Sequence, residues 1–158
     1  MNFFKTLVIT VILSGLFGSM SAGESVTKPD IGFKFDSSLP LTITSSQLNI
    51  EQSIGKATFI GDVVATQGNL ILSSEELLVE YEMENKRMTS VMKRLTAKIN
   101  VTFVSDEQSA ESKKMVYDVK SEKIIMTGNV FVTEGVSATS GDKLTINLIS
   151  GTRKMEGN

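Results

Sequence analysis

One eight-residue phrase occurs twice in the chain, with glycine in the same two positions. GDVVATQG begins at Gly61 and GNVFVTEG begins at Gly128, and the correspondence runs without a gap from Ala57/Ile124 to Glu80/Asn147. A catalytic loop seldom needs duplication, whereas a structural unit that stacks on its own copies does. The repeat therefore predicts a scaffold built from similar units.

A third, weaker copy lies between these two. Val101 and Phe103 stand where the first copy has Val63 and Ala65, but Ile99 replaces the glycine. We therefore expect a softer or shifted bend in the middle copy. Half a copy opens the array, because ITSSQLNIE matches LSSEELLVE. Each unit is a run of strands with one apolar face, and such a unit needs its neighbours to bury that face.

From residue 41 onward the sequence favours strands. Short runs rich in Val, Ile, Thr, Phe and Tyr alternate with Gly, Asn, Asp and Ser. SSEELLVEYEMENKRM has the charge content of a helix, yet its apolar residues alternate, so we predict two strands with a hairpin turn at Asn85. The repeated Gly61 and Gly128 predict bulges, and Gly68 and Gly135 predict turns with positive φ. The chain is expected to be all-β.

Alternation assigns side chains to two faces of the predicted sheet. Ala57, Phe59, Val63 and Ala65 share one face, and Thr58, Asp62 and Thr66 share the other. This pattern predicts one dry face and one wet face. The apolar exceptions on the wet side would cover an edge or a contact between subunits; they are Ile60, Val64, Ile125 and Phe131.

The composition argues against most enzyme classes. The chain has no His and no Cys, which excludes Ser-His-Asp triads, thiol nucleophiles and zinc sites built from these residues. A carboxylate-only site built from Glu75, Glu76 and Asp142 remains possible, but Glu75 and Asp142 occupy equivalent scaffold positions of the repeat and are interpreted as turn residues. We expect no catalysis, no cofactor and no metal. A net charge of −2 gives no electrostatic reason to expect nucleic acid as a partner.

The N-terminus has the pattern of an export signal. Lys5 precedes a short apolar run, TLVITVILSGLF, and small residues follow it. We predict a signal peptide at residues 1–22, an extended arm or linker at 23–40, and one β-domain at 41–158. An uncleaved membrane anchor is the alternative. IGFKF, within the arm, is either a strand or part of a disordered tail.

The repeated phrase and the small-small-acidic-x-Leu unit after it carry a family resemblance. GKATFIGDVVATQGNLILSSEELLVEYE, AKINVTFVS and KIIMTGNVFVTEGVSATSGDKLTINLISG, in this order, resemble the OstA-like family. The resemblance covers about residues 39–157 and implies an open β-jelly roll of stacked antiparallel strands. It also implies a soluble periplasmic protein that binds the acyl chains of lipopolysaccharide (lipid A) in an apolar groove. The implied partners are an inner-membrane export complex, an outer-membrane translocon and further copies joined head to tail.

The resemblance makes the inward apolar row the candidate lipid-binding groove. An open groove and a packed core would give the same row, so the sequence leaves both possible. The expected groove residues are Ala57, Phe59, Val63, Ala65, Leu70, Leu72, Leu77, Val79, Val101, Phe103, Met115, Tyr117, Ile124, Met126, Val130, Val132, Leu144 and Ile146.

Two alternative functions remain. A membrane-anchored subunit of the same export machine would keep the uncleaved N-terminal segment. A secreted β-repeat module would instead bind glycans. Adjacent basic pairs, Lys86–Arg87, Lys93–Arg94 and Lys113–Lys114, could contact sugar phosphates, but strand ends and turns commonly carry such pairs.

Overall fold

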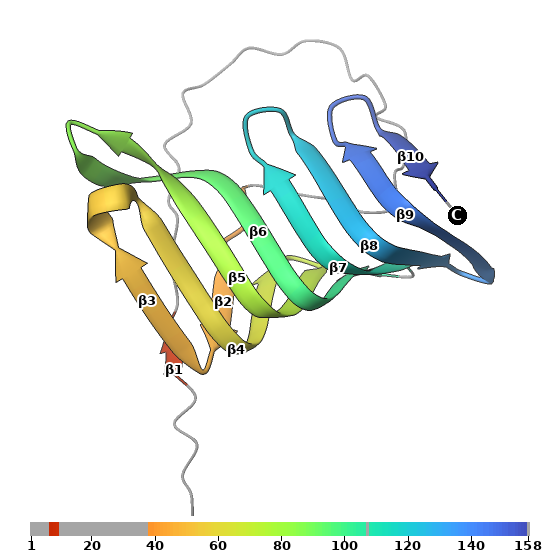
Figure 1. Cartoon of the computed structure of the whole chain (residues 1–158), viewed down its shortest axis with the longest axis horizontal. Coiled ribbons are helices and arrows are strands. Elements are labelled where there is room, and N and C mark those ends of the chain that lie inside the picture. The colour runs from red at the N-terminus through yellow and green to blue at the C-terminus, as the bar shows by residue number, and fades with distance from the viewer. Residues whose placement is uncertain (1–6, 10–37, 107, 158) are drawn as a thin grey trace, which may run out of the picture.

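A computed structural model of the chain describes residues 7–9, 38–106 and 108–157. These residues form one ten-stranded antiparallel sheet in the order β1-β2-β4-β5-β6-β7-β8-β9-β10, with β3 paired beside β4 (Figure 1). The predicted all-β fold is confirmed. The strands are β1 Leu7–Ile9, β2 Thr42–Ser45, β3 Gln47–Glu51, β4 Lys56–Gln67, β5 Leu70–Glu84, β6 Arg87–Ser105, β7 Gln108–Asp118, β8 Lys123–Glu134, β9 Ser137–Asn147 and β10 Thr152–Glu156, and one 3-10 turn, η1, spans Gln52–Ile54.

Of the predicted signal peptide, only β1 belongs to the described residues, and it pairs with β2. The IGFKF segment, for which the sequence leaves a strand and a tail both possible, lies outside them. The repeat unit is a pair of neighbouring strands, β4–β5, β6–β7 and β8–β9, each linked by a short turn. The opening half copy corresponds to β2 and β3. Both strands pair with one edge of β4, and β5 pairs with the other edge of β4.

The long strands bend at one line across the sheet, which we call the crease. In β4, β6 and β8 the pairing register shifts between Ile60 and Val63, Lys98 and Val101, and Thr127 and Val130. Gly61 and Gly128 have φ of 80° and 84° there, as their predicted bulges require. Ile99 and Asn100 also have positive φ, 65° and 52°. The expectation of a shifted bend in the middle copy was wrong, because Ile99 adopts the left-handed conformation without glycine.

The strands β2, β5 and β7, which lie beside the bulged strands, each have a serine at the crease. The Oγ atoms of Ser45, Ser74 and Ser112 donate to the backbone carbonyl two residues later, at distances of 2.8, 3.0 and 3.0 Å. Ser74 and Ser112 pair with the first valine after the neighbouring bulge, as Gly141 does in β9. Each serine hydroxyl thus finds a local backbone acceptor at the bend, which a buried polar group needs.

The crease divides the sheet into two arms. The first arm contains β2 and residues 63–74, 101–106, 108–112 and 130–141. The second arm contains β3, β10 and residues 56–60, 76–98, 114–127 and 143–147. Buried side chains from both arms form one core. Since no second layer covers either inner face among the described residues, the arms bury these faces against each other.

The turns follow the sequence prediction. Asn85 and Lys86 connect β5 to β6 with φ of 49° and 61°, the positive values that a two-residue type I′ turn requires at both positions. The strand interpretation of this acidic stretch is confirmed, and the helical alternative was wrong. Gly68 and Gly135 both have φ of 56° in turns at the end of the first arm.

Candidate functional site

The predicted inward row forms the core between the arms. All of the expected groove residues are buried except Val132, which is partly buried and packs against the core. Their inward orientation is therefore confirmed, whereas their role in binding stays a prediction. Sequence reasoning missed five core residues, which are Ile43, Leu95, Ala97, Ala110 and Leu148.

These omissions have simple causes. Ile43 and Leu148 lie at the ends of the array, where the repeat gives few matches. Leu95 and Ala97 alternate in RLTAKIN and could have been found by that signal. Ala110 is a small residue within the polar stretch EQSAES, and only its pairing with Phe103 and Val132 reveals its inward direction.

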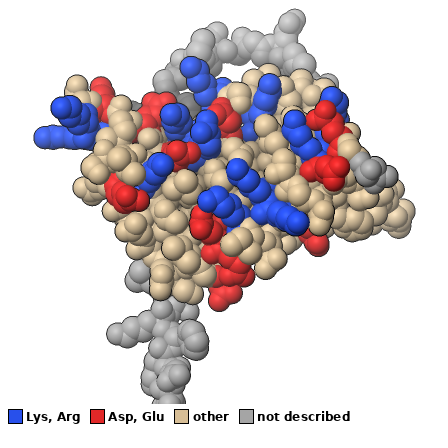
Figure 2. Space-filling view, in the orientation of Figure 1, with Lys and Arg blue, Asp and Glu red and all other residues tan. Residues whose placement is uncertain are grey.

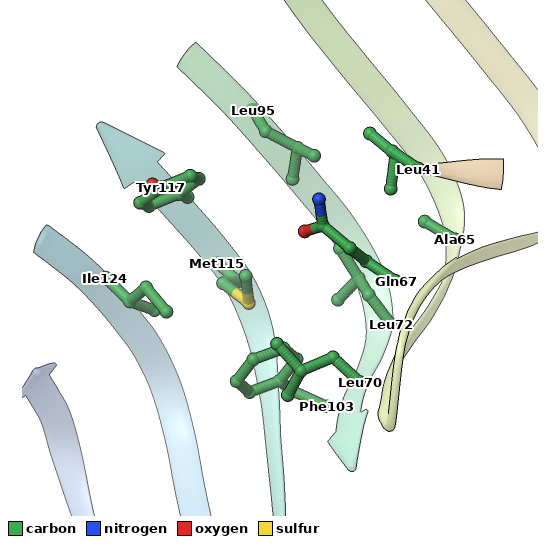
Figure 3. Close-up of a pocket in the computed structure, with 10 residues that line it drawn as sticks. All are labelled: Leu41, Ala65, Gln67, Leu70, Leu72, Leu95, Phe103, Met115, Tyr117 and Ile124. Atoms are coloured by element: carbon green, nitrogen blue, oxygen red, sulfur yellow. The ribbon is translucent and has the colours of Figure 1, made fainter. Parts of the chain in front are cut away.

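A cavity of about 40 Å³ lies between the arms. Figure 3 shows its side chains converging from several strands. Ala65, Gln67, Leu70, Leu72 and Phe103 come from the first arm, Leu95, Met115, Tyr117 and Ile124 come from the second, and Leu41 precedes β2. This volume is far below the roughly 300 Å³ of a small ligand pocket. The interior is thus a packed core with a small apolar void, and a long guest would require the arms to separate.

The cavity carries no charged side chain. Gln67 is the one amide in its lining, and its Nε2 donates to the carbonyl oxygen of Leu39 at 2.8 Å. Burial, with smaller contributions from the charges of Glu122 and Asp118, raises the pKa of Tyr117 to about 12. The phenol is therefore neutral at physiological pH. Such a lining suits hydrocarbon and disfavours an ionic guest.

The outer face of the second arm is strongly charged, and acidic and basic side chains intermix over the front of the molecule in Figure 2. Lys98 bonds Glu76 at 2.8 Å, and Arg94 lies 3.7 Å from Glu80 and 3.4 Å from Asp118. Hydrogen bonds from the backbone and side chain of Ser121, followed by Arg94, lower the pKa of Asp118. These cross-strand pairs hold charge on the solvent side of the arm.

Other residues from the sequence analysis lie away from the cavity. Glu75 in β5 and Asp142 in β9 are exposed and lie opposite the bulges of β4 and β8. Their interpretation as turn residues was wrong, because both lie within strands. Ile60 and Phe131 are exposed on the outer faces, whereas Val64 and Ile125 are partly covered. Within the described ranges, no cluster of three or more acidic residues could hold a metal ion.

The same described residues include no helix long and apolar enough to span a membrane.

The chain is similar to several known proteins. It is 22% identical to an uncharacterized protein of Rhizobium meliloti (strain 1021) over 154 residues. This alignment covers 95% of this chain and 83% of that protein. Over 112 residues it is 21% identical to the lipopolysaccharide export system protein LptA of Escherichia coli (strain K12), covering 70% of this chain but only 60% of that protein.

A solved structure has the same fold. The LptA homologous periplasmic component LptH of the lipopolysaccharide transport device from Pseudomonas aeruginosa matches with a TM-score of 0.65 at 15% identity, over 76% of this chain and 84% of that one. The family model described as LptA/(LptD N-terminal domain) LPS transport protein matches residues 42–152, which span β2 to the start of β10. The chain therefore belongs to the LptA/LptD N-terminal domain family, and its sheet is the β-jelly roll of that family.

Proposed function

We propose that this chain is a periplasmic carrier that holds the acyl chains of lipopolysaccharide between its two arms. The observation that carries the proposal is the uncharged cavity, to which both arms contribute apolar side chains. Two of the similar proteins are named as components of lipopolysaccharide export or transport, which supports the same substrate. Because the void is small, acyl chains would enter by displacing one arm from the other.

Photo-crosslinking in cells tests this proposal. Phe103 lines the cavity, and its neighbour Thr102 projects from the opposite face of the same strand. A photoreactive residue at position 103 should capture lipopolysaccharide, while the same residue at position 102 should not. Position 117 in the second arm should behave as position 103 does. Equal capture at 102 and 103 would refute the assignment of the groove.

We further propose that the chain bridges the inner-membrane export complex and the outer-membrane translocon by joining copies head to tail. The sheet is open, so β10 ends it at one side and β1 with β3 at the other. An edge strand carries unpaired backbone donors and acceptors that can receive another strand. In the structure β2 accepts β1 in this way, and without the predicted signal peptide that edge would be free.

The position of the last strand corrects one expectation. The sequence predicts one edge strand from about Lys143 to Met155, but this segment comprises the end of β9 and the separate strand β10. β9 pairs with β8 on one side and β10 on the other, so Thr145 and Ile146 are interior ladder positions. A proline at either position would disrupt the sheet itself and is unsuitable as a test of assembly.

The two alternative functions, a membrane-anchored subunit and a glycan-binding module, predict different experimental results. A membrane-anchored subunit would retain residues 1–22 in the mature protein, which N-terminal sequencing of the exported chain reveals. A glycan-binding module would bind the delipidated polysaccharide as well as the whole lipid. The carrier proposal expects loss of binding when the acyl chains are removed.

A further inference from the structure

The C-terminal end of the groove is closed by contacts between β10 and the first arm. β10 belongs to the second arm, yet Nη1 of Arg153 lies 3.2 Å from Oε2 of Glu134, which ends β8 in the first arm. Among the described residues, this is the only ion pair that joins the two arms; the other pairs lie within the second arm.

Arg153 has an unusual place for a cation. Its register partner in β9 is Ile146, which is fully buried, and the same row continues through Ile124 and Tyr117. The inner row of the second arm is thus apolar until its last strand, where an arginine faces the opposite arm. A guest that leaves the groove at this end would pass Arg153.

Glu134 is held from both sides. Nε2 of Gln108 donates to its Oε1 at 2.7 Å, while Arg153 engages the other carboxylate oxygen. Gln108 is only 7% exposed, and its own Oε1 is buried without a hydrogen-bond partner among the described residues. A buried acceptor without a donor is unfavourable, so the closed arrangement leaves one polar group unsatisfied.

The Arg153–Glu134 pair is also exposed enough to be weak. The two side chains retain 31% and 51% of their accessible surface, and pairs in such surroundings are strongly screened by water and salt. A weak contact between two otherwise apolar faces can open and close readily.

We propose that Glu134 and Arg153, with Gln108 behind them, form a latch that keeps the arms together at the C-terminal end of the groove and opens when lipid passes. The inference rests on the proposed carrier function for its purpose, but the opening itself is a property of the protein alone. Breaking the latch should therefore make the arms open more often at this end even without lipid.

The first test measures the distance between the arms. The chain has no cysteine, so spin labels can be attached to introduced cysteines at Ala138 and Thr152, which are exposed on opposite arms. Glu134→Gln and Arg153→Gln should lengthen and broaden the distance distribution, as should high salt. Glu76→Gln is the matched control, because it breaks a pair of similar exposure within the second arm. An unchanged distribution in both latch variants would overturn the proposal.

The second test measures loading with purified lipopolysaccharide and with a fluorescent fatty acid. Loss of a screened ion pair should speed association roughly two- to fivefold in the latch variants, with no change for Glu76→Gln. A short thiol cross-linker between cysteines at 134 and 153 should slow loading until it is cleaved, and loading unaffected by the cross-link would overturn the latch. If no variant binds either lipid but the arms still open in the first test, the carrier function is refuted. The latch would then still be supported by the distance measurement.

Discussion

Ile99 in β6 has the left-handed backbone conformation that Gly61 has at the equivalent bend of β4, with φ of 65° against 80°. A β-branched residue is rarely found there, because its Cβ crowds the following carbonyl group. Ile99 is 55% exposed, so burial of its side chain offsets little of the conformational strain at this position. The middle bend is therefore imposed by its neighbours in the sheet.

Ile99→Gly should consequently stabilise the protein. Relief of the left-handed strain is worth about 1–2 kcal/mol, less about 0.5–1 kcal/mol for the greater freedom of glycine in the unfolded chain. We expect a net gain of up to about 1.5 kcal/mol in the free energy of unfolding, measured by urea denaturation. Asn100→Gly is the control and should gain less, since asparagine tolerates positive φ.

Gly141→Ser should weaken the attachment of β10. Serine occupies the corresponding crease position in β2, β5 and β7, but a Cβ at Gly141 would lie 2.7 Å from Cγ and Sδ of Met155 and 3.0 Å from the carbonyl oxygen of Glu156. Overpacking of this kind costs roughly 1–3 kcal/mol. Urea unfolding should show this loss, and Met155→Ala should recover part of it in the double variant. Equal stability of Gly141→Ser and the parent would show that β10 does not press on this position.

Alkaline pH should destabilise the fold through Tyr117. Its folded pKa of about 12 lies above the unfolded value of 10.0, so the stabilisation is complete below pH 10 and is lost as pH rises toward 12. The loss should amount to roughly 1–3 kcal/mol, and Tyr117→Phe should reduce it. The only other tyrosine is Tyr81, whose pKa is also raised by burial. In a Tyr81→Phe variant, phenolate absorbance therefore reports Tyr117 alone, and ionisation near pH 10 would contradict the prediction.

Phe103 and Phe131 provide a matched test of the inner and outer faces. Phe103 is 4% exposed in the cavity, whereas Phe131 is 43% exposed on the outside of the same arm. Phe103→Asp should destabilise the fold by about 3 kcal/mol or more and abolish lipid binding, because it places an unpaired charge in the core. Phe131→Asp should change stability by about 0.5 kcal/mol or less. Lipid binding that survives Phe103→Asp in folded protein would contradict the groove assignment.

Periodicity predicted the parts of this molecule that depend on neighbours along the chain. The alternation around Phe59 and Met126 assigned the inner face, and Asn85 marked a turn, because both signals are local. The bend at Ile99 could not be predicted, since the paired strands on both sides impose it against the preference of the residue. The contact of Arg153 with Glu134 depends on how the two arms approach, which no spacing within one strand encodes. The small volume of the cavity likewise follows from packing between arms.

Head-to-tail assembly should depend on β10 and on the β2–β3 edge. Single cysteines at Thr44 in β2 and at Lys154 in β10, carried on separate copies without the predicted signal peptide, should become joined by a short thiol cross-linker. Edge strands supply the unpaired backbone groups for this contact, and the heterologous contact does not close, so products should form a ladder rather than a fixed dimer. Lys154 lies on a charged edge of the sheet. Its ammonium group, and to a smaller extent that of Lys143, lowers the pKa of Glu156. These charges should keep the association modest and reversible.

A cysteine at Thr102 is the control for this cross-linking, because β6 pairs with strands on both sides and offers no free edge. Joining of position 44 to 154 but not to 102 would identify the two ends of the sheet as the contact. Deletion of residues 152–158 removes the edge strand β10 and should reduce the ladder to monomer. Sedimentation of the parent chain at rising concentration completes the test. A single monomeric species up to high concentration would refute self-assembly and would leave any bridge to depend on the membrane partners.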